Sequence, residues 1–287
     1  MASAWQSAAH GQGWVSWLDE GGWTRTLDTF SPMVPALAVE IAWEVRDPEI
    51  SAARLAQVVG KDPILAVNVV RLANSAFSAS ATTITSLNEA VVRMGTRAVR
   101  QLVTAACLTS RLRNPKTFGS HARQMVDHSV GAGYLASQVA ERIGADPDAA
   151  FLYGLLHDIG KFVILKLAHD DKPIPPTMGQ ARLAACIESR HAAVGARALE
   201  LWRFAREIRL PVAFHHDPAA ATGEQRSAAV AYLANRLAHR YGFGCEPDPA
   251  DLQQDPVFVQ LGLDERFMER LDSHAPAILD VAAKIAA

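Results

Sequence analysis

Helix-start signals recur along this chain, and none of its apolar runs alternates with polar residues in the manner of a β-strand. Asp62-Pro63 supplies a capping carboxylate and a first-turn proline, and Ser86-Leu87-Asn88-Glu89 is a capping box. Gly144 can end one helix, and Asp146-Pro147 can start the next. Alanine, leucine and arginine fill the intervening segments and favour helix. The sequence therefore predicts an all-α fold, a bundle of many helices.

Three segments are expected along the chain. Residues 1–23 hold four of the six tryptophans among glycines and show no helical or strand period, which indicates an irregular arm. We expect its indoles to pack on the main body, with docking of a partner as the alternative. The main body is predicted over 24–242, as a helical part 24–113 followed by a second part 114–242, because the composition changes near Asn114-Pro115. A helical extension is predicted over 243–287.

The last amphipathic stretch of this extension is predicted to run from Ala275 to the end of the chain. We expect it to pack against the body, with contact in a homodimer as the alternative. The three cysteines, Cys107, Cys186 and Cys245, are widely spaced and form no CxxC pair, so reduced thiols are expected.

Charge and hydropathy exclude several classes of partner. A formal net charge of -2, from 28 basic and 30 acidic residues, gives no broad attraction to phosphate backbones or anionic lipid. Nucleic acid and membrane are therefore not expected as partners. Arg93, Arg97 and Arg100 lie at helical spacing, and we expect a solvated helix face there. The sequence has no signal-peptide pattern and no apolar run long enough to span a bilayer, which predicts a cytoplasmic protein.

Histidine carries the main chemical signal. Five of the ten histidines fall in an ordered series, His128, His157-Asp158, His191 and His215-His216. Each alone would more often be structural, but neutral imidazole and carboxylate together are ligands for Fe, Mn, Zn or Ni, and a carboxylate can bridge two ions. The apolar run 151–156 precedes His157-Asp158 and predicts that the pair is buried. The series predicts a pocket for one or two divalent ions.

Several motifs resemble those of the HD superfamily of metal-dependent phosphohydrolases, and more specifically its HDOD branch, which is related to the HD-GYP cyclic-di-GMP phosphodiesterases. They are Val34-Pro35-Ala36-Leu37, Lys61-Asp62-Pro63, Arg71-Leu72-Ala73-Asn74-Ser75-Ala76-Phe77, Gly154-Leu155-Leu156-His157-Asp158-Ile159-Gly160-Lys161, His191-Ala192-Ala193-Val194-Gly195-Ala196 and His215-His216-Asp217-Pro218. The resemblance implies an HD-type helical fold between about Ser31 and Gly242, and a role in bacterial signalling. It implies metal ligation by His128, His157, Asp158, His191, His215 and His216. It also implies that Lys161 would lie near the scissile phosphate and would be catalytic only if the chain is an enzyme.

Two positions depart from the hydrolase pattern. Asn235 stands where the HD enzymes have their final metal-binding aspartate, and its neutral carbonyl oxygen is the weaker ligand. Asp217-Pro218-Ala219-Ala220 follows His216, where the cyclic-di-GMP enzymes carry a glycine-tyrosine-proline loop. We therefore expect a regulatory domain without hydrolytic activity that binds a protein partner or a small phosphorylated ligand. The alternative is a metal-dependent phosphohydrolase that acts on a nucleotide or another phosphate ester.

Overall fold

The computed structural model describes residues 49–76, 84–110, 112–170, 180–244 and 251–285, together with Glu44, Asp47 and Pro247. Every regular element in this part of the chain is helical, which confirms the all-α prediction. The tryptophan-rich arm and Cys245 lie outside the described residues. No helix within the described ranges combines the length and apolarity needed to cross a membrane.

The described helices follow one another along the chain with short connections. They are α4 (Ala52–Val59), α5 (Pro63–Ala76), α6 (Leu87–Met94), α7 (Thr96–Thr109), α8 (Pro115–Phe118), α9 (Ala122–Arg142), α10 (Pro147–Leu156), α11 (Ile159–Asp170), α12 (Gln180–Leu201), α13 (Arg206–Ala213), the 3₁₀ turn η2 (Pro218–Ala220), α14 (Gln225–Arg240), the 3₁₀ turn η3 (Leu252–Gln254), α15 (Pro256–Gln260) and α16 (Glu265–Ile285).

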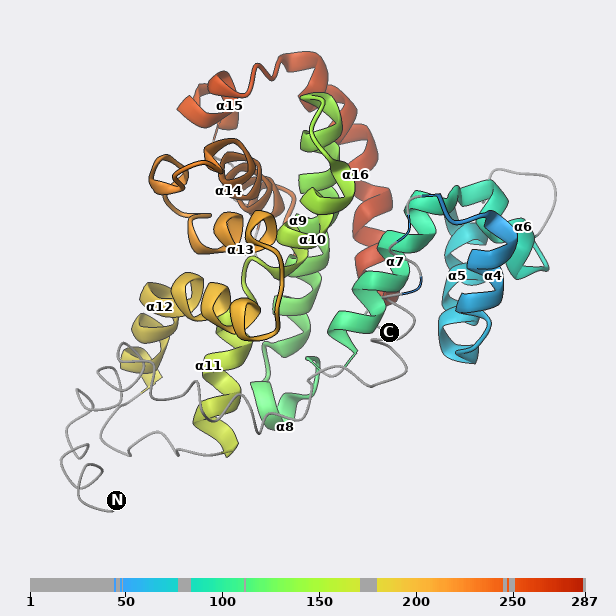
Figure 1. The fold of residues 1–287 in the computed structure, drawn as a ribbon, viewed down its shortest axis with the longest axis horizontal. Helices are drawn as coiled ribbons and strands as arrows, with labels where there is room; N and C mark the ends of the chain where they lie inside the picture. The colour runs from blue at the N-terminus through green and yellow to red at the C-terminus, as the bar shows by residue number, and fades with distance from the viewer. Residues whose placement is uncertain are drawn as a thin grey trace.

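Two groups of helices lie side by side, with α7 and α16 between them (Figure 1). Helices α4 to α6 form the smaller group, and α9 to α14 form the larger one. Helix α16 packs against α5 and α7 and also against α9, so the C-terminal helix contacts both groups. The buried aliphatic and aromatic side chains form one continuous core through both groups.

The predicted helix starts are confirmed by their caps. The Asp62 carboxylate accepts from the backbone N–H of Leu65 at 3.2 Å, and the Ser86 hydroxyl accepts from that of Glu89 at 3.1 Å. Asp146 caps α10 in the same way. These caps satisfy backbone donors that have no partner in the first turn of a helix.

The C-terminal helix is longer than predicted. The stretch from Ala275 is the second half of α16, which begins at Glu265. The helix starts earlier because the Asp264 carboxylate accepts from the backbone N–H of Phe267 at 2.9 Å and caps it there.

The prediction of a solvated arginine face is wrong for Arg100. Its side chain is 7% exposed, pairs with Asp148 at the start of α10, and donates to the Asp47 carbonyl at 2.8 Å. Arg97 is exposed and pairs with Glu141 at 3.1 Å, as a solvated residue would. The two arginines differ because Arg100 faces the start of α10, whereas Arg97 pairs with Glu141 near the end of α9.

Cys107 and Cys186, the two cysteines within the described ranges, are both buried. Burial raises the pKa of the Cys107 thiol to about 12, so it stays protonated and unreactive at neutral pH.

Candidate metal centre

The turn between α10 and α11 carries the central pair, His157 and Asp158. Helix α10 consists largely of apolar residues and is buried on most of its surface, so the turn that follows it lies inside the protein. His157 Nδ1 donates to the Gly154 carbonyl at 2.8 Å, which leaves the Nε2 lone pair free to face inward. That Nε2 atom is buried and has no hydrogen-bond partner.

Gly160 allows α11 to approach α12 closely. A Cβ atom at Gly160 would lie 1.9 Å from the His191 carbonyl oxygen and 2.7 Å from the Gly195 nitrogen. No other residue type fits this crossing without moving a helix, because both neighbouring atoms belong to the backbone. The glycine of the His-Asp-Ile-Gly-Lys motif therefore brings His191 to the Asp158 carboxylate.

Three histidines meet on one side of Asp158, and we call them the three-histidine group: His191 from α12, and His215 and His216 from the turn after α13. His191 Nε2 lies 3.2 Å from His215 Nε2 and 3.0 Å from His216 Nε2. His191 Nδ1 faces the Ile187 carbonyl at 2.9 Å, and His215 Nδ1 faces the Val212 carbonyl at 2.7 Å. Donation to these carbonyls leaves the Nε2 lone pairs turned toward one another.

On the other side of Asp158 lies a second set, the His128 group: His128 from α9, His157, and Asn235 from α14. His128 Nε2 is 2.9 Å from Asn235 Oδ1, and His128 Nδ1 is 3.3 Å from the Phe243 carbonyl. A neutral imidazole has a single N–H, so His128 can donate to one of these oxygens and not to both.

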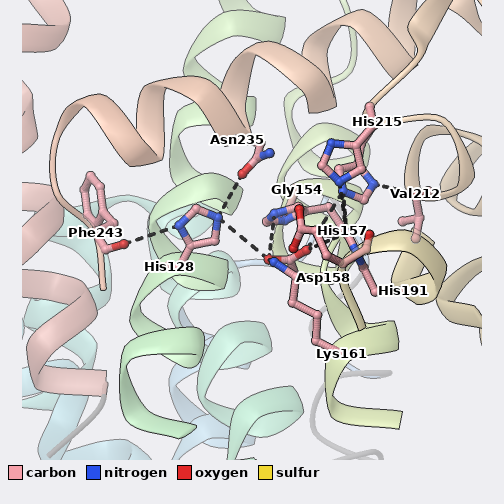
Figure 2. A network of polar contacts seen from close by, with 12 residues as sticks. His128, Gly154, His157, Asp158, Lys161, His191, Val212, His215, Asn235 and Phe243 are labelled. Atoms are coloured by element: carbon pink, nitrogen blue, oxygen red, sulfur yellow. Dashed lines mark hydrogen bonds and ion pairs between the residues drawn. The ribbon is translucent and has the colours of Figure 1, made fainter. Parts of the chain in front are cut away.

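Asp158 stands between the two sets (Figure 2), and each of its oxygens faces a different one. Its Oδ1 atom lies 3.2 Å from His191 Nε2 and 3.9 Å from His215 Nε2. Its Oδ2 atom lies 3.4 Å from His157 Nε2 and 3.9 Å from His128 Nε2. Lys161, in the first turn of α11, places its Nζ atom 2.8 Å from the same Oδ2.

The protonation states suit metal ligation. Burial is the main cause that lowers the pKa of His128, to about 3, and burial also lowers the pKa values of His191, His215 and His216. These imidazoles are therefore neutral at physiological pH, which is the form that binds metal. Burial opposes ionisation of Asp158, but the electrostatic interactions with His157 and Lys161 outweigh it and hold the pKa of its carboxyl well below the usual value.

The donor atoms fit a divalent transition-metal ion. Nε2 lone pairs at 3.0 and 3.2 Å repel one another unless a proton or a cation lies among them. Four ligands around zinc at about 2.0–2.1 Å stand roughly 3.3 Å apart, which is close to the spacings in the three-histidine group. The His157 Nε2 atom, which has no hydrogen-bond partner, is a further donor, 3.4 Å from Asp158 Oδ2.

The structure brings all the sequence-predicted site residues together, from three helices and two interhelical turns, and adds contributors that the sequence did not suggest. His239 packs its ring on His128, with centroids 4.7 Å apart, and the backbone carbonyl of Phe243 faces the same imidazole. His239 lies four residues after Asn235, on the same face of α14, and this spacing could have indicated it. A backbone carbonyl leaves no such signal in a sequence.

The fold is shared with several solved structures. A candidate phosphohydrolase from Shewanella amazonensis is 21% identical, with a TM-score of 0.70 over 91% of this chain and 97% of its own. An HDOD domain protein of unknown function from Geobacter sulfurreducens is 24% identical, with a TM-score of 0.66 over 88% and 92%. A candidate signal transduction protein from Marinobacter aquaeolei is 24% identical, with a TM-score of 0.60 over 88% and 59%. At these identities the likeness shows the fold.

Curated sequence relatives extend well beyond the matched segment. The matches span 37%, 8% and 15% of the lengths of three such proteins. The HDOD domain family itself matches residues 31–218, which is more than half of the chain and includes all the predicted ligands except Asn235. The chain belongs to the HDOD domain family.

Proposed function

We propose that this chain is a cytoplasmic, bacterial-type regulatory HDOD protein that does not hydrolyse phosphate esters. Its metal-binding pocket holds the larger helix group in one arrangement, and the helices present a surface to a partner protein or to a small phosphorylated ligand. The observation that carries the proposal is the contact between His128 Nε2 and Asn235 Oδ1 at 2.9 Å.

Hydrolysis of a phosphate ester by a pair of ions needs both ions to hold the attacking and leaving oxygens. On the His128 side the amide of Asn235 supplies no negative charge, so a divalent ion there would be bound by neutral groups and by one shared carboxylate oxygen. Lys161, which could stabilise charge on a phosphate, is 2.8 Å from Asp158 instead. Both features weaken the case for catalysis and leave a ligand set suited to holding helices together.

A structural role follows from where the ligands come from. His128, His157-Asp158, His191, His215-His216 and Asn235 lie on five segments that are far apart in the chain. An ion bound by several of them ties these segments together and stabilises the folded state by mass action. The similar candidate signal transduction protein supports a regulatory use of this fold.

The second candidate function is a metal-dependent phosphohydrolase for a nucleotide or another phosphate ester. It is favoured by the complete three-histidine group with Asp158 Oδ1, and by the similar candidate phosphohydrolase. In this reading the protein would orient the ester against the ion, and Lys161 would turn to the phosphate and offset its charge.

A turnover assay separates the two. Untagged protein loaded with Mn²⁺ or Fe²⁺ is incubated with a panel of phosphomonoesters, phosphodiesters and cyclic dinucleotides, beside a His157→Ala, Asp158→Ala double variant as the control. The regulatory proposal expects no turnover above that of the double variant. Turnover by the wild type that the double variant lacks would establish the phosphohydrolase.

A further inference from the structure

Asp158 divides its two carboxylate oxygens between unlike surroundings. Oδ1 faces the three-histidine group, with His191 Nε2 at 3.2 Å and His215 Nε2 at 3.9 Å. Oδ2 faces the His128 group and also the Lys161 ammonium, whose Nζ atom lies 2.8 Å away. The Lys161 ammonium therefore pairs with the oxygen that faces the His128 group.

The Lys161 ammonium occupies the oxygen that a second metal ion would need. Lys161 lies in the first turn of α11, three residues after Asp158, and its side chain is 23% exposed, so the aliphatic stem is largely covered. A divalent ion bound by the His128 group through Oδ2 would lie beside this positive charge, and like charges at such distances repel strongly. Asn235, a neutral amide, contributes no charge to offset that repulsion.

The three-histidine group meets Asp158 through Oδ1, and the Lys161 ammonium lies closest to the other oxygen, although its charge also reaches His191. Its three Nε2 atoms and Asp158 Oδ1 give three neutral nitrogens and a share of one carboxylate, a set that suits a tetrahedral zinc ion. Two of its imidazoles are oriented by Nδ1 contacts to the Ile187 and Val212 carbonyls, so little reorganisation is needed to bind an ion.

We propose that the pocket binds a single divalent ion, through the three-histidine group and Asp158 Oδ1, and that Lys161 takes the place of a second cation on Asp158 Oδ2. This inference deepens the proposed regulatory function and rests on its view of the pocket as a metal-binding element. In this proposal the Lys161 ammonium balances the negative charge on Asp158 Oδ2.

The first test measures stoichiometry with Zn²⁺ alone. Untagged apoprotein is titrated by calorimetry, and the metal that remains after desalting is measured by mass spectrometry. We expect about one zinc per chain for the wild type and for His128→Ala, and loss of that zinc for His191→Ala. His274→Ala, at an exposed position on α16, is the matched control and keeps the ion.

Two tightly bound ions in the wild type, or none, would overturn the assignment. Loss of zinc in His128→Ala with retention in His191→Ala would also overturn it, because the ion would then lie on the other side of Asp158. Circular dichroism of each apoprotein separates loss of ligand from loss of fold.

The second test asks whether Lys161 excludes the second ion. The Lys161→Met, Asn235→Asp double variant removes the competing charge and supplies a carboxylate, so we expect it to bind about two ions. Lys161→Arg keeps the charge and Lys116→Met removes an exposed lysine on α8, and both are expected to bind about one. If the double variant binds one ion, Lys161 does not act as the second cation.

If the double variant does not fold, the Lys161→Met single variant tests whether Lys161 excludes the second ion. Its second zinc should bind about tenfold more tightly than any second zinc in the wild type, because one repelling charge is gone. An unchanged affinity would overturn the role of Lys161.

These outcomes are distinct from failure of the proposed function. Turnover by a wild type that holds one ion would overturn the regulatory proposal and leave the single-ion assignment standing. Two ions without turnover would do the reverse.

Discussion

Replacing Gly160 with alanine tests the close crossing of α11 and α12 that assembles the pocket. The new Cβ would lie 1.9 Å from the His191 carbonyl oxygen, and real Cβ contacts are not shorter than 3.0 Å, so one helix must move by about 1 Å or more. Overpacking of this kind costs about 1–3 kcal/mol, and the gain in helix propensity from glycine to alanine offsets about 1 kcal/mol of it. Because His191 moves with its backbone, we also expect zinc affinity to fall by about 10–100-fold.

Gly195→Ala is the matched control, since it lies in the same crossing and gains the same helix propensity. Its Cβ would lie 3.1 Å from the Gly160 nitrogen, a contact that shifts of a few tenths of an ångström relieve. Urea denaturation of the two apoproteins should therefore rank Gly160→Ala below both Gly195→Ala and the wild type. Zinc calorimetry on the same samples should give the same order. Equal stability and equal zinc affinity for the two variants would refute the reasoning.

Three further predictions concern stability. Apoprotein in a chelator should lose at least about 1.4 kcal/mol of unfolding free energy between pH 7.5 and 5.5, measured by urea denaturation. The sign follows from His128, which the fold keeps neutral: its contribution is complete above its unfolded pKa of 6.5 and is lost as pH falls from there toward its folded pKa of about 3. An unfolding free energy that does not change with pH would show that the buried imidazoles take up protons as readily in the folded state as in the unfolded state. Arg100→Met should lower the free energy of unfolding by about 1–3 kcal/mol, because it leaves the Asp47 carbonyl and Asp148 without their donor. Arg97→Met should lower it by under about 0.5 kcal/mol. Similar shifts in thermal denaturation for the two variants would contradict the burial of Arg100. Asp146→Ala should cost about 1 kcal/mol in thermal denaturation, through loss of the cap on α10, and Asp146→Asn should recover most of it.

The sequence predicted the helices well where their signals are local. The caps at Asp62, Ser86 and Asp146 involve residues two or three apart, so residue type and spacing were enough to place those helix starts. The sequence pattern places the start of the last helix ten residues too late, because its amphipathic period is clear only from Ala275, whereas the cap that starts α16 is Asp264. The solvated face assigned to Arg100 failed for a different reason, since helical spacing cannot show which side of α7 another helix covers.

The residue types at the pocket came from the sequence by itself. Imidazole and carboxylate in the order His128, His157-Asp158, His191 and His215-His216 predicted a metal pocket, and Asn235 indicated its weak position. Residue type alone fixes which ligand atoms a side chain can offer. The family resemblance indicated which distant residues belong to one site.

Only the tertiary structure decided which groups each oxygen of Asp158 contacts. Asp158 turns Oδ1 to His191 and Oδ2 to Lys161, and His239 lies against His128. These contacts depend on how five segments pack, and that packing depends on residues far apart in the chain. A change of 1 Å at the Gly160 crossing would alter these distances without altering the pattern of residues. The sequence determined which side chains can serve as cation ligands, and the packing of α11 against α12 decided which oxygen of Asp158 faces His191.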